Sequence, residues 1–223
     1  MELNDVMRTT FSARDYTGEK LPDALIYDLI ENARFAPSGG NRQGNRVIVV
    51  RDQGTRDALS KLAEPAAKRY VAQIKAGESP WTAWTPTTVS AAEIEATQPA
   101  AMLINSFKDA SVVLVFVVDL KVVASMDQDL DRIGMISGAS IYPFVWNVLL
   151  GARQAGFGGT ITTLAAAREG ELQALLNIPA EFAVAAVVPL GKPVKQLTKL
   201  SRKPVEEIAN HERFDGPALK KGA

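Results

Sequence analysis

Short apolar runs alternate with amphipathic stretches along most of this chain. β-Branched runs bounded by polar residues are typical of buried strands, and they predict strands at residues 46–51, 111–118 and 183–190. Apolar side chains at helical spacing predict helices at residues 4–9, 22–35 and about 55–75. This order of elements favours an α+β fold in which helices flank a mixed central sheet.

Residues 138–155 are apolar on nearly every side of a helical wheel, with Tyr142, Val145 and Trp146 among the apolar side chains. A helix of this kind must be buried all round. Burial within one core and burial across a subunit interface both remain open. The second alternative would make the protein a dimer.

Residues 77–99 are rich in Pro, Thr, Trp and Ala. An insertion of this kind in a compact domain is more often a functional cover than an idle loop. We expect a mobile lid that includes Trp81 and Trp84, and surface packing away from any site is the alternative. No composition shift marks a linker, so residues 1–223 are expected to form a single domain.

The composition narrows the chemistry. The 223 residues include 25 Lys and Arg against 25 Asp and Glu, so no net charge attracts nucleic acid or an anionic membrane. The chain has no cysteine and one histidine, His211, which argues against thiol nucleophiles, catalytic triads and histidine-rich metal sites. We therefore expect no metal site, a small-molecule partner, and a cofactor that carries the reaction if the protein is an enzyme.

Apolar segments also bear on location. The first residues, Met1 to Asp5, form no apolar signal segment. The longest uncharged apolar run, residues 112–118, is much shorter than the ~20 residues of a membrane-spanning helix. We expect a cytoplasmic protein with no membrane partner.

The sharpest local motif is the turn at residues 36–43, Ala-Pro-Ser-Gly-Gly-Asn-Arg-Gln, which joins an amphipathic helix to a strand. Glycines let the backbone approach a ligand closely, and Ser38, Asn41 and Gln43 supply hydrogen-bonding groups. A plain helix-terminating turn is the alternative.

Two further clusters could bind a phosphate. Arg8, Thr10, Ser12 and Arg14 place guanidinium and hydroxyl groups close together in the sequence. Residues 199–204 form a basic tract that ends in proline. Solvated surface segments remain the alternative for both.

In this order, the motifs resemble the nitroreductase family, and the resemblance runs from Met1 to about Phe214. The strings that carry it are Ser-Ala-Arg-Asp-Tyr at residues 12–16, the turn at 36–43, Asn-Val-Leu-Leu at 147–150, Gly-Phe-Gly at 156–158 and Arg-Lys-Pro-Val-Glu-Glu at 202–207. The resemblance implies a three-layer α+β sandwich with a mixed sheet. It also implies an intertwined homodimer with FMN between the subunits.

The same resemblance assigns site residues. The phosphate contacts that it implies are Arg8, Thr10, Ser12, Arg14, Lys199 and Arg202. The contacts that it implies around the flavin ring are Pro37, Ser38 and Gly39 from the second subunit, Asn41, Ser140, and the backbone of Thr162, Thr163 and Leu164 at the reactive edge. No side chain is expected to be catalytic, because the chemistry takes place on FMN, with Thr163 near its reactive edge.

The expected function is that of a ping-pong oxidoreductase. NADH or NADPH would reduce FMN, and a nitroaromatic, a quinone or a similar small electron-poor acceptor would then take the electrons. Other reactions on the same fold remain alternatives: dehalogenation, dehydrogenation, flavin fragmentation, or flavin binding without turnover. A helical interaction domain without a cofactor is the remaining alternative.

Overall fold

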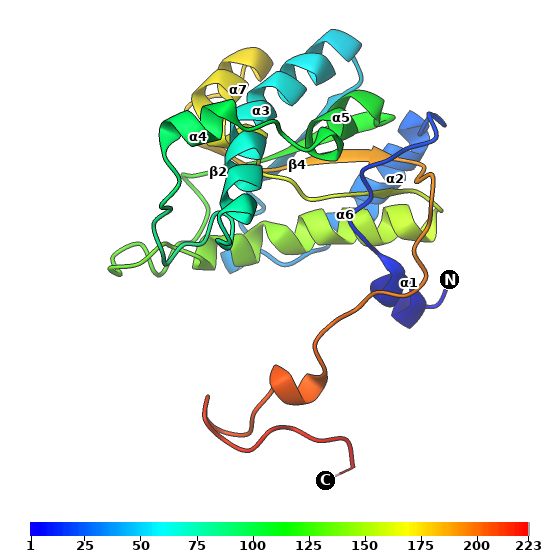
Figure 1. Cartoon of the computed structure of the whole chain (residues 1–223). Helices are drawn as coiled ribbons and strands as arrows, with labels where there is room; N and C mark the ends of the chain where they lie inside the picture. The colour runs from blue at the N-terminus through cyan, green and yellow to red at the C-terminus, as the bar shows by residue number, and fades with distance from the viewer. Residues whose placement is uncertain (223) are drawn as a thin grey trace.

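A four-stranded sheet lies between two layers of helices in the computed structural model, which describes residues 1–222 (Figure 1). The strands are β1 (Asn45–Val50), β2 (Val112–Asp119), β3 (Gly158–Gly159) and β4 (Phe182–Gly191). The α-helices are α1 (Leu3–Thr9), α2 (Asp23–Ala33), α3 (Gln53–Lys75), α4 (Ala91–Ala96), α5 (Ala101–Asp109), α6 (Tyr142–Gln154) and α7 (Glu169–Leu176). Short 3-10 turns are η1 (Gly39–Asn41), η2 (Ile136–Ser140), η3 (Ala165–Arg168) and η4 (Val205–Glu207).

The sheet has the strand order β1-β2-β4-β3, and the pairs formed by these strands are antiparallel. The parallel contribution within residues 1–222 is a single bridge between Ser12 and Gly159. This arrangement confirms the expected α+β sandwich. The three strands expected from β-branched runs are present to within one residue at each end. The short β3 has no such run and was not expected.

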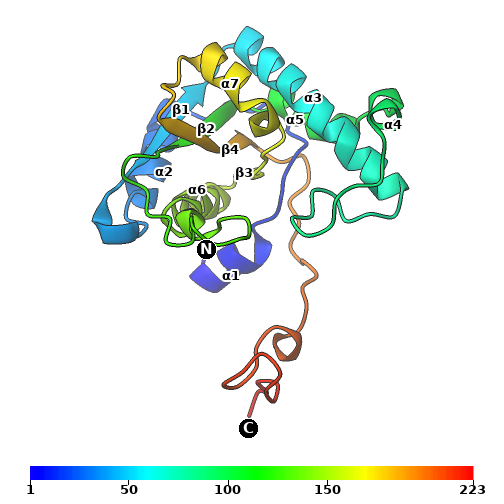
Figure 2. The ribbon, with the colours of Figure 1, turned by 90° about the vertical axis from the view of Figure 1, so that its left-hand side faces the viewer.

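The central strand β2 separates two apolar cores. Successive side chains of a strand point to opposite faces. Val112, Leu114 and Phe116 therefore pack with α2 and α6, and the intervening Val113 and Val115 pack with α3, α5 and α7. Figure 2 shows the two helical layers on either side of the sheet. Burial on both faces explains why β2 is a continuous apolar run rather than an alternating one.

Helix α6 is only partly covered by its own chain. It begins at Tyr142, because residues 136–140 form η2 instead of extending the helix. Val145 and Val148 are fully buried in the core, whereas Tyr142 and Trp146, one turn apart, remain 43% and 40% exposed. Burial all round is therefore not achieved within one chain. None of the helices in residues 1–222 combines the length and apolarity needed to cross a membrane.

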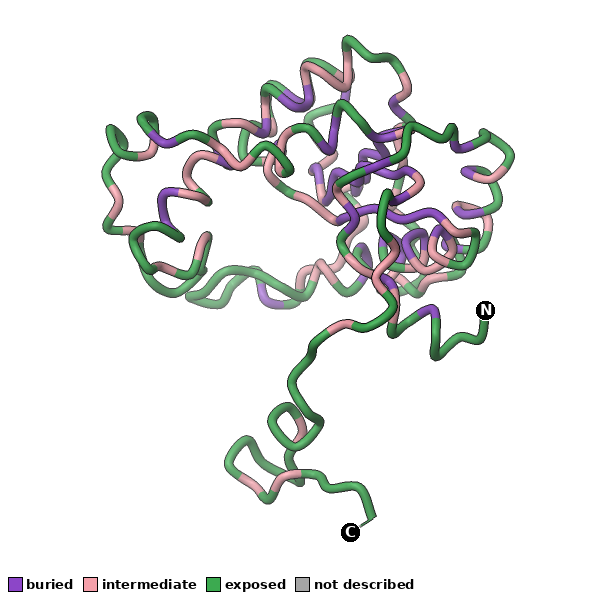
Figure 3. Tube along the Cα trace, turned by 45° about the vertical axis from the view of Figure 1, so that its right-hand side comes forward, coloured by how far each residue is buried: buried purple, intermediate pink, exposed green. Residues whose placement is uncertain are grey.

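The carboxyl-terminal arm, residues 192–222, leaves the body of the molecule (Figure 1). Its base is held by a bridge between Tyr16 and Pro193 and by a hydrogen bond from Gln196 Nε2 to Thr9 O. Beyond that point the arm is exposed along nearly its whole length, as Figure 3 shows, and it carries apolar side chains such as Ile208 and Phe214.

Close backbone packing holds β3 against β4. A Cβ atom at Gly159 would lie 2.5 Å from Pro189 O, so only glycine fits this position without a shift of the backbone. We expect Gly159→Ala to lower the free energy of unfolding by about 1–3 kcal/mol, the usual effect of overpacking. The measurement is denaturant unfolding followed by circular dichroism.

Gly170, in α7, is the matched control for this prediction. It has no atom within 4 Å of its Cβ position. Gly170→Ala should raise stability by about 0.5–1 kcal/mol, because alanine loses less backbone entropy in a helix. Equal effects of the two substitutions would contradict the steric account of β3.

Candidate functional site

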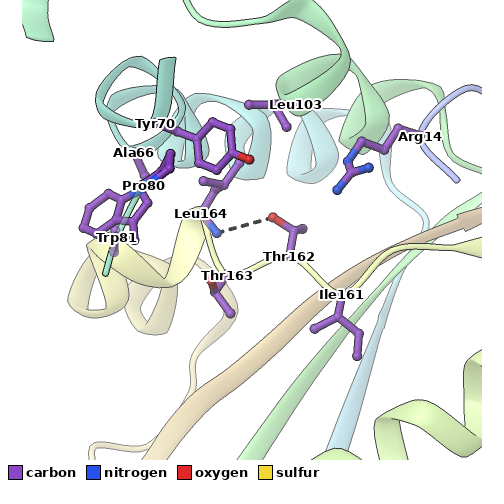
Figure 4. A pocket seen from close by; sticks show the side chains of 11 residues that line it. Arg14, Ala66, Tyr70, Pro80, Trp81, Leu103, Ile161, Thr162, Thr163 and Leu164 are labelled. Atoms are coloured by element: carbon purple, nitrogen blue, oxygen red, sulfur yellow. Dashed lines mark hydrogen bonds between the residues drawn. The ribbon is translucent and has the colours of Figure 1, made fainter. Parts of the chain in front are cut away.

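One cavity of about 460 Å³ lies between α3, α5 and the segment that follows β3 (Figure 4). This volume is within the usual range for small-molecule sites. The cavity is lined by Arg14, Ala66, Tyr70, Pro80, Trp81, Leu103, Ile161, Thr162, Thr163, Leu164 and Ala167. Four of these residues, Arg14 and Thr162 to Leu164, are among those that the family resemblance implied.

The segment Thr162 to Leu164 is held rigidly to the sheet. Thr162 forms a two-way bridge with Val187 of β4, with N···O distances of 2.9 and 2.8 Å. The Thr162 hydroxyl accepts a longer 3.4 Å bond from Leu164 N–H, drawn in Figure 4. Among residues 1–222 the Thr163 N–H donates no hydrogen bond. This backbone donor is therefore available to a ligand.

Arg14 reaches the same cavity from the amino-terminal segment. Ala13 N donates to Gly159 O at 3.1 Å, which ties this segment to β3. The buried Tyr16 hydroxyl lies 3.0 Å from Pro189 O of β4, and burial raises its pKa. The Arg14 guanidinium has one weak bond of 3.3 Å, to Ser12 O, so its other N–H groups can serve a ligand. Figure 4 shows it at the far end of the cavity from Trp81.

The other residues expected at the phosphate do not line this cavity. Arg8 is exposed on α1, and Ser12 is exposed beside β3. Thr10 is buried, and its hydroxyl donates to Val6 O at 2.7 Å, which closes the end of α1. Lys199 and Arg202 are exposed on the carboxyl-terminal arm. In one chain these five residues therefore lie outside the lining of this cavity.

The turn at residues 36–43 forms a second cluster, apart from the cavity. Gly39 N donates to Ser140 Oγ at 2.9 Å, and Gln43 N donates to Ser38 Oγ at 3.0 Å. Gly40, Asn41 and Gln43 all have positive φ angles, of 59°, 54° and 51°. Such a run persists only when its surroundings fix it, and it is most common at functional sites. Pro37, Gly39 and Asn41 are exposed around this turn.

The loop at residues 120–136 packs against this turn. Ala124 lies 3.1 Å from the Cβ position of Gly39. Asp127, whose side chain is 3% exposed, accepts hydrogen bonds from Arg132 Nη1 and Met135 N, each at 2.7 Å. The Met135 N–H and the Arg132 guanidinium lower the pKa of Asp127 to about 2. This buried carboxylate organises the loop, and no pattern in the sequence had indicated it.

The outer wall of the cavity was largely missed from sequence. Tyr70 and Leu103 line it and had not been identified. Tyr70 lies one helical turn beyond Ala66 on α3, and this spacing is the only sequence signal that both face the same cavity. Trp81 lines the cavity, whereas Trp84 is 93% exposed and does not.

Comparison with known proteins agrees with this architecture. The family model described as the nitroreductase family matches residues 7–192. A curated relative from Thermus thermophilus, named NADH dehydrogenase, is 40% identical over 52 residues. These residues are 23% of this chain and 25% of that protein, so the match spans a quarter of the relative's length.

Solved structures share the fold at low sequence identity. Iodotyrosine deiodinase bound to FMN and 3-iodo-L-tyrosine superimposes with a TM-score of 0.68 and 20% identity, covering 96% of this chain and 100% of that one. NADPH:FMN oxidoreductase from Vibrio harveyi complexed with NAD⁺ has a TM-score of 0.67 and 18% identity, covering 96% and 78%. Because the family model matches most of its length, the chain belongs to the nitroreductase family.

Proposed function

We propose that this protein is an FMN-dependent oxidoreductase that uses NADH or NADPH to reduce nitroaromatic, quinone or similar small electron-poor acceptors by a ping-pong mechanism. The observation that carries the proposal is the convergence of Arg14 with Thr162 to Leu164 on one cavity, in a chain of the nitroreductase family. The similar folds named above support it, since one is bound to FMN and the other is named for FMN.

The residues of the cavity fit a flavin. Its polar end offers the Arg14 guanidinium and the free Thr163 N–H, and its remaining lining is mainly apolar. When bound, FMN supplies the two-electron chemistry, in which hydride is taken from the nicotinamide and passed on to the acceptor. Donors fixed in a water-poor site stabilise the negative charge that such chemistry develops.

The chain itself contributes binding and orientation rather than proton transfer. The cavity lining contains no carboxylate and no imidazole. Arg14 carries a permanent charge and serves as an electrostatic anchor. The bridge between Thr162 and Val187 fixes the floor against which the ring would lie. In this proposal no side chain is catalytic, and the chemistry takes place on FMN.

We also propose that the active unit is a homodimer of single-domain chains. Gly39 N donates to Ser140 Oγ, and Ser38 lies in the same turn, away from the cavity that Thr163 lines, so one chain presents two separate parts of a site. In the dimer, the turn of one subunit, with Ser140 and Asn41, would face the cavity of the other. Lys199 and Arg202 would join Arg8, Thr10 and Ser12 at the phosphate. Contact through the Thr10 hydroxyl requires that it leave Val6 O.

The direct test of the function is the visible spectrum of the purified protein. We expect flavin absorption bands, and FMN as the cofactor released on denaturation. NADH or NADPH should bleach these bands without oxygen, and a quinone should restore them while it is reduced to the hydroquinone. A colourless protein that does not take up added FMN would reject the proposal, and bound flavin that nicotinamide fails to reduce would indicate a binding protein.

The basic arm generates a second prediction. We expect Arg202→Ala to weaken FMN binding by about ten- to a hundredfold, because a guanidinium can make a bidentate charged contact with a phosphate. Lys203→Ala is the matched control, since both side chains are exposed on the same arm. Fluorescence titration with FMN gives both dissociation constants. Equal, small effects would remove the arm from the site.

The exposed face of α6 generates a prediction about the dimer. A charge placed at Val145 would disrupt the core of one chain, because Val145 is fully buried there, so it would not test the interface. Trp146→Asp should instead leave the chain folded and lose dimer and FMN together, because burying a lone carboxylate at an interface is costly. Leu175→Asp is the control, since Leu175 is 37% exposed on α7 in the opposite helical layer.

Analytical ultracentrifugation with detection at the flavin wavelength measures assembly and occupancy together. Added FMN should tighten the parental dimer by mass action. A folded Trp146→Asp monomer that keeps FMN at the parental stoichiometry would place the whole site within one chain.

A further inference from the structure

The segment that leaves α3 toward the cavity is tied back to the helix. Gly77, with φ of 76°, ends the helix in the left-handed conformation. Gly77 N donates to Ile74 O at 3.0 Å, and Glu78 N donates to Gln73 O at 2.9 Å. This pair of bonds is the Schellman arrangement, which closes a helix end and sets the direction of the following chain.

The Glu78 carboxylate joins this helix end to the returning part of the loop. It accepts hydrogen bonds from Thr87 Oγ1 at 2.6 Å and from both the N–H and the hydroxyl of Thr88 at 2.7 Å. Gln73 Nε2 also donates to it at 3.1 Å. One side chain therefore closes the loop at residues 78–88.

These donors also decide the charge of the carboxylate. The hydroxyl of Thr87 and the N–H of Thr88 lower the pKa of Glu78 to about 2, from an ordinary value of 4.5. Because the pKa of the folded form is depressed, the carboxylate stabilises the loop fully above the ordinary value. That contribution declines as the pH falls below the ordinary value and is lost as the pH falls through about 2.

Gln73 links Glu78 to Trp81, because its side chain bonds to both. Gln73 is 1% exposed, and its side-chain Oε1 accepts a hydrogen bond from the backbone N–H of Trp81 at 3.2 Å. Trp81 has φ of 56°, which is rare for a bulky residue. The Arg69 guanidinium lies 4.2 Å from the centroid of its ring, within range of a cation–π interaction. A backbone hydrogen bond to Gln73 and a cation–π contact from Arg69 thus hold Trp81 and its indole ring.

The fixed indole forms part of the cavity wall. Trp81 and Pro80 line the cavity together with Tyr70 of α3, at the end away from Arg14 (Figure 4). Glu78 does not line the cavity, so any influence it has on a ligand acts through Trp81. These contacts favour a preorganised wall over the mobile cover expected from the sequence.

We propose that Glu78 is a positioning residue that holds Trp81 as an aromatic wall, and that Trp81 with Tyr70 favours fused two-ring acceptors over single-ring ones. This inference rests on the proposed function, because it assigns the polar end of the cavity to FMN and the aromatic end to the acceptor. A flat acceptor gains stacking contact from a ring whose position is already fixed.

Amide hydrogen exchange on the FMN-loaded protein tests the positioning role. Glu78→Gln should speed exchange at the Trp81 and Thr88 amides by at least about tenfold, because the neutral amide cannot accept all four bonds. Glu93→Gln is the matched control. Glu93 also accepts two bonds from one residue, Ser90 N and Ser90 Oγ, but it caps α4 and does not contact Gln73. Unchanged exchange in Glu78→Gln would overturn the inference.

Acceptor kinetics test the selection. Menadione serves as the two-ring probe and para-benzoquinone as the single-ring probe. Trp81→Ala should raise KM for menadione by about three- to tenfold and KM for para-benzoquinone by less than about twofold, with kcat changed less. Glu78→Gln should move the ratio of the two KM values in the same direction, and Trp84→Ala should leave it unchanged.

The outcomes separate this inference from the proposed function. FMN occupancy and quinone turnover with an unchanged KM ratio in Trp81→Ala would overturn the inference and leave the function standing. A protein that binds no FMN would overturn both. Faster loop exchange together with a shifted KM ratio supports the inference.

Discussion

Close packing of backbone at β3 is the constraint on which the site depends. Gly159 lies so near Pro189 O that no side chain fits between β3 and β4 at this position. Gly159 also joins the amino-terminal segment, through a bridge with Ser12 and a hydrogen bond from Ala13 N. Arg14 therefore emerges on one side of this junction, and Thr162 to Leu164 emerge on the other. Parts of the chain nearly 150 positions apart thus line one cavity.

The same architecture determines which apolar side chains stay exposed in one chain. Helices cover both faces of the sheet, and the large apolar side chains that remain exposed include Tyr142 and Trp146 of α6 and Ile208 and Phe214 of the arm. Tyr142 and Trp146 form one face of α6, and Ser140, which accepts a hydrogen bond from the turn at residues 36–43, lies just before that helix in the sequence. A second copy that covered this face would also bring a turn to the cavity edge. Assembly and cofactor binding would then be coupled, because ordering of one lowers the entropy lost in the other.

The sequence predicted elements whose stability is local or whose burial is continuous. Strands β1, β2 and β4 were predicted correctly because runs of β-branched residues strongly favour strands. Helices α2 and α3 were predicted correctly because their apolar residues recur at helical spacing. Helices α4, α5 and α7, of six, nine and eight residues, were not predicted, although the similarly short α1 was. The convergence of Arg14 with Thr163 came from the family resemblance alone. Nothing local in either segment indicates that the first joins β3 at Gly159 and the second joins β4 at Val187.

Sequence patterns did not predict the hydrogen bonds that Glu78 and Asp127 accept from residues about ten positions away. The two sets of bonds are arranged in the same way. Glu78 gathers Thr87 and Thr88, and Asp127 gathers Met135 and Ile136, each across about ten positions. In each case a carboxylate accepts backbone N–H groups, and the pKa of the acid is lowered to about 2. One loop borders the cavity and the other borders the turn. The charge is thus placed outside the cavity, where it orders the loops before a ligand arrives and reduces the entropy that binding must remove.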